Sequence, residues 1–181
     1  MTPLTATIRR PEPTEYAPFY EGYISLVKTE GNSGDIVATL QKQAIETRDL
    51  LAKVSAEQAE FRYAPGKWSV KEVLGHINDT ERIMGYRALR IARGDRTPIE
   101  GFEQDDYIAA GKFGRRTMDD LLQEFMTIRN ATVELVRHLD AEASERRGTA
   151  NNKEISVRAI IYVIAGHELH HRRILREKYL Q

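Results

Sequence analysis

The chain is predicted to fold as an all-α four-helix bundle. Four long segments carry apolar residues at helical spacing, and three of them begin at a residue that caps helices. No stretch of useful length alternates apolar and polar residues as a strand does. At 181 residues the chain is long enough for one such domain with its own core.

The N-terminal residues 1–32 are predicted to form an arm that packs on the bundle, and the bundle domain takes residues 33–181. Prolines restrict the backbone of this segment, and a cluster of aromatic residues favours packing on the body over free extension. The prolines are Pro3, Pro11, Pro13 and Pro18, and the aromatic residues are Tyr16, Phe19, Tyr20 and Tyr23. We expect a short helix near residues 14–26.

The first two long helices are predicted at about residues 35–54 and 69–93. Apolar and small residues form a stripe along the first: Ile36, Leu40, Ala44, Thr47 and Leu51. In the second, Ser69 and Glu72 have the spacing of a capping box, and Gly94 supplies a stop signal.

The third long helix is predicted to begin at Thr117, with Asp120 three residues further on, and it carries apolar residues as far as Leu139. The fourth is predicted to be capped by Ser156 and to run to about Tyr179. Both segments keep apolar residues on one face, as a helix in a bundle requires.

Three connections join these helices. Residues 55–68 form a compact link that ends at Trp68, the only tryptophan. The connection at residues 94–116 is long enough to be a functional or covering segment, and we expect a short helix near residues 103–110. The span from 146 to 155 is polar and is predicted to be a solvated loop.

The composition excludes several classes of function. Lys and Arg together number 27, as do Asp and Glu, so the formal charge is zero and no nucleic-acid partner is expected. The chain has no cysteine, which excludes disulfides, thiolate metal sites and cysteine nucleophiles. No apolar run is long enough for a signal peptide core or a membrane span, so we expect a cytoplasmic protein without a membrane partner.

The most informative motif is His167-Glu168-Leu169-His170-His171 in the fourth helix. His167 and His171 are four residues apart and share one helical face, a spacing that offers two nitrogens to one metal ion. They interrupt the stripe that should face the bundle interior, whereas His170 is turned toward the rim. Two packed histidines without a metal remain the alternative, since such pairs are common in helices.

The motif also fits the zinc-protease pattern H-E-x-x-H. Proteases of this type take their third ligand downstream, but Ile174 and Glu177 stand where the metzincin extension needs Gly and His. A zinc protease is therefore ranked far below the other hypotheses. A third histidine must come from upstream.

His76 is the best-placed third histidine because it lies on the core-facing stripe of the second helix. A bundle can bring this stripe against the fourth helix. Three neutral imidazoles would hold a divalent metal (Zn, Ni, Fe or Mn) and leave a position open for water or substrate. His138, near the end of the third helix, is interpreted as structural.

Acidic residues near these histidines are weak catalytic candidates. Asp79, Glu81 and Glu168 are close enough in sequence to orient an imidazole or to act as a base. Each is equally well explained as a solvated or ion-paired helix residue, and Glu168 is expected to be within reach of the histidine face but not pointed inward. Only Glu168 and Asp79 are kept as candidates.

Three segments resemble the DinB-like superfamily and, within it, the DinB/YfiT-like metalloenzymes with a DinB_2-type domain. The segments are PGKWSVKEVLGHINDTERI, GFEQDDY and AGHELHHRRIL, which together span most of the chain. The resemblance implies a four-helix bundle, often a homodimer, with a divalent metal on His76, His167 and His171. All three histidines of the family pattern are present.

The resemblance also implies an activity. Some members transfer a low-molecular-weight thiol such as mycothiol or bacillithiol, or isomerise maleylpyruvate, and others are similar to metal-dependent hydrolases. The leading hypothesis is an enzyme whose metal activates a thiol or water for attack on a small electrophilic substrate, with S-transfer slightly favoured over hydrolysis. The alternative is a non-catalytic dimeric stress-related protein with a structural metal or no metal.

Overall fold

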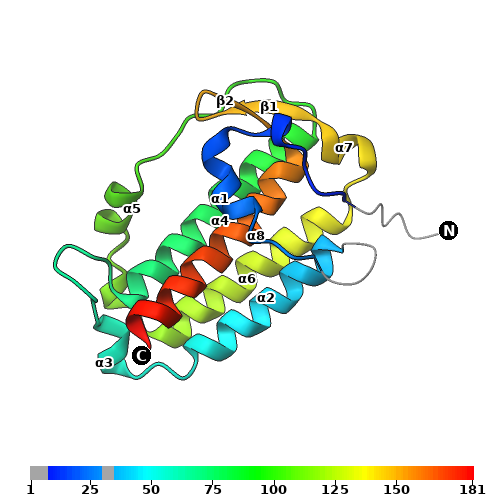
Figure 1. Cartoon of the computed structure of the whole chain (residues 1–181). Helices are drawn as coiled ribbons and strands as arrows, with labels where there is room; N and C mark the ends of the chain where they lie inside the picture. Colours follow the sequence, from blue (N-terminus) through cyan, green and yellow to red (C-terminus); the bar gives the residue numbers. More distant parts are fainter. Residues whose placement is uncertain (1–7, 30–34) are drawn as a thin grey trace.

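Four long helices form the body of the protein and confirm the predicted four-helix bundle (Figure 1). The computed structural model describes residues 8–29 and 35–181. The long helices are α2 (Ile36–Leu51), α4 (Val70–Ala92), α6 (Met118–Arg137) and α8 (Val157–Ile174). Each of α4 and α2 packs against both α6 and α8. A π-helical turn, Leu175–Tyr179, continues α8.

The predicted start signals are confirmed by hydrogen bonds at three helix N-termini. Ser69 and Glu72 form a capping box at α4, where each side chain accepts a hydrogen bond from the other residue's backbone N–H. The Thr117 hydroxyl accepts from the backbone N–H of Asp120 at α6, and the Ser156 hydroxyl caps α8. These caps fix where the site-bearing helices α4 and α8 begin.

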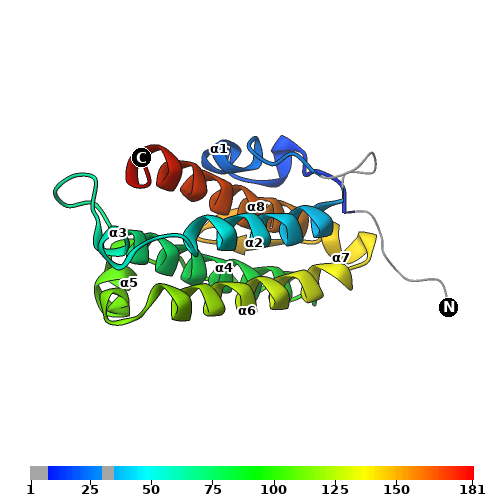
Figure 2. The ribbon, with the colours of Figure 1, turned by 90° about the horizontal axis from the view of Figure 1, so that it is seen from below.

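The N-terminal arm packs on the outside of α8, and Figure 2 shows it on the side away from α6. It consists of two single 3-10 turns, Pro13–Glu15 and Pro18–Tyr20, followed by the one-turn helix α1 (Glu21–Ile24). The prolines explain why the predicted helix at 14–26 is broken into these short pieces. The predicted domain boundary between residues 32 and 33 lies outside the described residues.

Two contacts hold the arm on α8. Arg158 on α8 donates to both carboxylate oxygens of Glu15, at 2.7 and 2.5 Å. Burial raises the pKa of Glu15, but the hydrogen bonds from Arg158 and from the backbone outweigh it and lower this pKa to about 2. At Gly166 the backbone of α8 touches the carbonyl of Tyr23, where any Cβ would overlap with that carbonyl.

The predicted solvated loop at 146–155 is wrong, because these residues form an antiparallel hairpin. Its strands are β1 (Arg147–Ala150) and β2 (Lys153–Ser156). Asn151 and Asn152 form the two-residue turn with φ of 51° and 58°, a conformation that Asn tolerates and that matches the twist of paired strands. The strands are too short and polar to show an alternating apolar pattern in the sequence.

The connections contain more helix than expected. The short helix predicted near 103–110 is present as α5 (Gln104–Gly111), which is followed by a 3-10 turn at Phe113–Arg115. Two further short helices, α3 (Ala56–Glu60) and α7 (Ala141–Glu145), were not predicted. No helix of the described residues is long and apolar enough to cross a membrane.

The core consists of two apolar clusters separated by a layer of buried polar side chains. Along each long helix, buried residues of one cluster give way to residues of the other. The change lies between Leu40 and Ala44 on α2, between Ile77 and Met84 on α4, between Phe125 and Val133 on α6, and between Ala165 and Leu175 along α8 and its π-helical turn. The buried polar residues at or near these intervals include Gln43, Thr47, His76, Glu81, Arg129, His167, Glu168 and Arg172. This set is called the polar layer below.

Candidate metal centre

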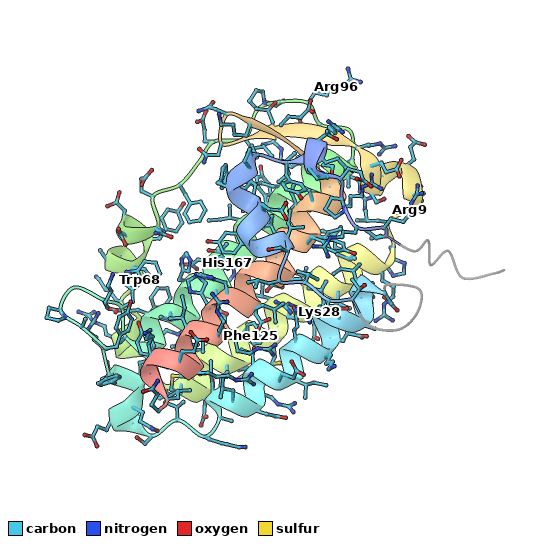
Figure 3. All side chains as sticks on the ribbon, viewed as in Figure 1. Arg9, Lys28, Trp68, Arg96, Phe125 and His167 are labelled. Carbon is cyan, nitrogen blue, oxygen red and sulfur yellow. The ribbon has the colours of Figure 1, made fainter. Side chains whose placement is uncertain are left out.

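Three imidazoles that are far apart in the sequence meet at one edge of the polar layer. The Nε2 atom of His167 lies 2.9 Å from Nε2 of His76 and 3.1 Å from Nε2 of His171. The candidate ligand atoms of these three side chains all lie within 4.8 Å of one another. His76 comes from α4 and the other two from α8. His167 is labelled in Figure 3.

Burial keeps these imidazoles neutral. It lowers the pKa of His76 to about 4 and the pKa of His171 to about 3, where the neighbouring imidazoles add to the effect. The pKa of His167, a residue that is 6 % exposed, is lowered well below its ordinary value by the same causes. All three side chains therefore present uncharged nitrogens at neutral pH.

The converging nitrogens fit a cation better than they fit one another. A neutral imidazole carries one N–H, and its other ring nitrogen has a single in-plane lone pair. The Nε2 atom of His167 faces two other Nε2 atoms, so it can donate to only one of them or accept well from only one. One divalent ion would accept lone pairs from all three nitrogens, which are ligands of the borderline kind that Zn or Ni prefers.

Aromatic rings surround the three histidines. The indole of Trp68 lies on His76, with ring centroids 4.7 Å apart, and Tyr23 meets His167 edge-on at 5.5 Å. His170 is partly buried and contacts Tyr23 at 5.4 Å without joining the cluster, in agreement with the predicted rim position. The sequence identified neither aromatic contact, since Tyr23 comes from the N-terminal arm and Trp68 from the link before α4, both outside the long helices.

A cavity of about 330 Å³ opens beside His171. This is close to the lower end of the size range for small-molecule sites. Its walls come from the link before α4, from α5 and from the C-terminal turn, and include Tyr63, Lys67, Trp68, Gln104, Asp105, Ile174 and Tyr179. Tyr179 donates a hydrogen bond to the backbone carbonyl of Trp68 at 2.8 Å, which ties the backbone of Trp68 to the C-terminal turn. The indole itself both contacts His76 and lines the cavity.

Glu168 points into the bundle, contrary to the expectation that it is not pointed inward. It is 1 % exposed, accepts a hydrogen bond from the Thr47 hydroxyl, and lies 3.6 Å from Nε of Arg172. Burial raises the pKa of its carboxyl group although the charges of Arg129 and Arg172 oppose this. The interior face of α8 is thus wider than the histidine stripe, and Glu168 does not line the cavity.

The other acidic candidates also lie away from the cavity. Asp79 is partly buried, 3.8 Å from Arg82 on the same helix. Glu81 lies deep in the polar layer and forms a buried ion pair with Arg129. His138 follows the end of α6 with an exposed side chain, 3.5 Å from Glu134, and takes no part in the cluster.

Comparisons with known proteins agree with this architecture. YfiT from Bacillus subtilis, whose solved structure is described as that of a probable metal-dependent hydrolase with an unusual four-helix bundle topology, matches with a TM-score of 0.71. The two sequences are 14 % identical over 96 % of each chain, so the likeness concerns the fold. No functionally curated protein matches the sequence. Residues 39–175, more than half of the chain, match the DinB superfamily, and the chain therefore belongs to that family.

Proposed function

We propose that this protein is a metal-dependent enzyme acting on a small molecule, with a divalent ion held by His76, His167 and His171. The observation that carries the proposal is the meeting of three uncharged nitrogens that hydrogen bonds among themselves cannot all satisfy. A divalent ion held there would supply Lewis-acid chemistry, which lowers the pKa of a water or thiol. Zn, Ni, Fe and Mn all suit imidazole ligands.

The surroundings of the cluster favour a catalytic role over a structural one. Structural zinc sites have four protein ligands, whereas the described residues around this cluster supply three. His171 lines the cavity, so a substrate bound there would lie directly beside the cluster. Trp68 and Tyr179 give the cavity an aromatic wall suited to the apolar part of such a substrate.

We place hydrolysis first and S-transfer second. The slight preference for thiol transfer that the sequence suggested rests on family resemblance alone, and no described residue of the cavity is specific for a thiol. The similar fold of YfiT, described as a probable metal-dependent hydrolase, supports water as the nucleophile. A homodimer and a cytoplasmic location remain predictions for sedimentation and fractionation experiments.

Metal titration of purified variants tests the ligand set. We expect the wild-type protein to bind one equivalent of Zn²⁺, and His167→Ala to lose at least a hundredfold in affinity. His138→Ala is the matched control because it removes an exposed histidine distant from the cluster, and it should bind like the wild-type protein. Equal binding by His167→Ala and His138→Ala would contradict the proposed site.

A turnover screen tests the reaction class. Zn²⁺- and Ni²⁺-loaded protein would be assayed with a panel of esters, amides and phosphoesters, and separately with a thiol and an electrophile. We expect turnover in the first panel that chelation and His167→Ala abolish. Turnover only in the presence of the thiol would rank S-transfer above hydrolysis. No turnover of the loaded protein in either panel would leave the site with a structural role.

A further inference from the structure

The connection that carries α5 is fixed at both ends. At one end Ile99 donates to the carbonyl of Thr149 and its own carbonyl accepts from Asn151, both at 2.9 Å, next to the hairpin. At the other end the ring of Phe113 fills the space that a Cβ on Gly75 would occupy. Gly75 immediately precedes His76, so the helix α5 between these anchors has a defined position beside the cluster.

Asp105 in the first turn of α5 faces the cavity that His171 also lines. Of the described residues that line it, Asp105 alone carries a carboxylate. No hydrogen bond or ion pair to Asp105 exists within the described part of the chain, so the carboxylate is available to a ligand.

The helix dipole does not explain why Asp105 faces the cavity and its neighbour Asp106 does not. Acidic residues stabilise the first turn of a helix through its dipole, and both Asp105 and Asp106 occupy that turn. Asp106, however, does not line the cavity. Two adjacent residues of the same type therefore differ in whether they face the site, which makes Asp106 a matched control.

We propose that Asp105 is a catalytic residue that accepts the proton of the attacking nucleophile; this inference rests on the proposed function. As the O–H bond of water breaks, the proton passes to the Asp105 carboxylate and the oxygen lone pair forms the new bond to the electrophilic carbon of the substrate. The leaving group then takes the proton from Asp105 as its own bond to that carbon breaks, which returns the carboxylate. A thiol would deliver its S–H proton to the same oxygen.

The two earlier acidic candidates suit this role less well. Glu168 is enclosed by Thr47, Arg129 and Arg172 inside the bundle, and Asp79 lies outside the cavity wall. A general base must reach the nucleophile directly or through one water. Asp105 is the carboxylate that shares a cavity with one of the three histidines.

Benzohydroxamic acid is a suitable probe because it binds divalent ions, carries an acidic proton that a neighbouring carboxylate can accept, and has a ring for the aromatic wall. Trp68 is the only tryptophan of the chain and lines the cavity, so its fluorescence reports binding there. Zn²⁺ affinity and then the dissociation constant of the probe would be measured for the Zn²⁺-loaded wild-type protein and for Asp105→Asn, Asp105→Glu and Asp106→Asn.

We expect Asp105→Asn to bind Zn²⁺ within a few-fold of the wild-type protein, because Asp105 is not among the grouped ligands. Its dissociation constant for the probe should rise about tenfold or more, as expected for a lost hydrogen bond to a charged group. Asp106→Asn should leave both constants unchanged, and Asp105→Glu should recover part of the probe affinity. With any substrate from the turnover screen, Asp105→Asn should lower kcat far more than it changes KM.

The outcomes separate this inference from the function on which it rests. Failure of the wild-type protein to bind Zn²⁺ more tightly than His167→Ala overturns the proposed function, and the role of Asp105 with it. Normal Zn²⁺ binding with equal probe affinity in the wild-type protein and Asp105→Asn overturns the role of Asp105 only. An equal loss of probe affinity in Asp106→Asn also overturns it, because the effect would then be one of general charge.

Discussion

Replacing Glu81 by glutamine is expected to lower the free energy of unfolding by about 3–5 kcal/mol, the usual cost of removing one partner of a buried ion pair. Glu81 and Arg129 are 3 % and 0 % exposed. Arg129 donates from Nε and Nη2 to the two carboxylate oxygens at 2.8 and 2.9 Å, and from Nη1 to the carbonyl of Leu40 at 3.1 Å. Glutamine keeps the shape of Glu81 but leaves the guanidinium charge without its counter-charge.

Coulomb's law gives a similar magnitude. Two unit charges about 4 Å apart attract by about 4 kcal/mol at an effective dielectric constant near 20, the value that suits most protein sites. The fully buried guanidinium cannot recover this interaction from water without opening the bundle. Glutamine still accepts one hydrogen bond, so the lower half of the range is the better expectation.

Urea unfolding followed by circular dichroism measures this change. The matched control is Glu134→Gln, which breaks an exposed pair with Arg137 that has a 3.5 Å separation and should cost less than about 1 kcal/mol. The double variant Glu81→Leu with Arg129→Met should recover much of the loss, because apolar replacement of a whole buried pair is often neutral. A cost for Glu81→Gln no greater than that of the control would refute the reasoning.

Three further predictions concern metal binding, the arm and its contact with α8. Zn²⁺ at about a hundredfold above its dissociation constant should stabilise the protein by about 2.7 kcal/mol, or roughly 5–10 °C in Tm for a chain of this size, and calorimetry should find no such shift in His167→Ala. Glu15→Gln should cost on the order of 2 kcal/mol at neutral pH. Because the folded pKa of Glu15 is lowered to about 2, this difference should be present above about pH 4.5 and disappear as the pH falls toward 2; a difference that persists there in urea titrations would exclude Arg158 as its cause. Gly166→Ala should destabilise by about 1–3 kcal/mol because its Cβ meets the α1 backbone, whereas Gly85→Ala, with open space at its Cβ, should stabilise α4 by up to about 1 kcal/mol; equal thermal shifts would contradict this account.

The sequence predicted the long helices well because their signals are local. Capping residues such as Ser69 and Thr117 act within three residues of the helix they begin, and an apolar stripe repeats every turn. The hairpin at 147–156 was missed for the opposite reason, since its strands are stabilised by pairing with each other and with Ile99 from a distant connection. Such pairing leaves little periodic pattern in eight residues of strand.

The histidines of the candidate site could be predicted, but its walls could not. The spacing of His167 and His171 predicts that they share one helical face. His76 lies at a core position of the only other apolar stripe that contains a histidine. Trp68 and Asp105 belong to connections, whose course depends on anchors such as Phe113 on Gly75. The direction of Glu168 was predicted wrongly for a similar reason. Both α2 and the arm pack on α8 and widen its buried face, and the sequence of α8 alone does not show this.

The polar layer itself argues for function over stability. Buried ion pairs such as that of Glu81 with Arg129 add little net stability compared with apolar side chains of the same volume, and three imidazoles without sufficient partners cost free energy. The apolar clusters on either side of the layer supply the burial that stabilises the fold. All four long helices nevertheless replace apolar residues at or near this one level, and the cavity opens at its edge beside His171. Packing alone does not favour a layer of buried polar side chains, whereas a charged site does. The fixed charges and hydrogen bonds of the layer hold the histidine-bearing helix α8 in one register against α2 and α6.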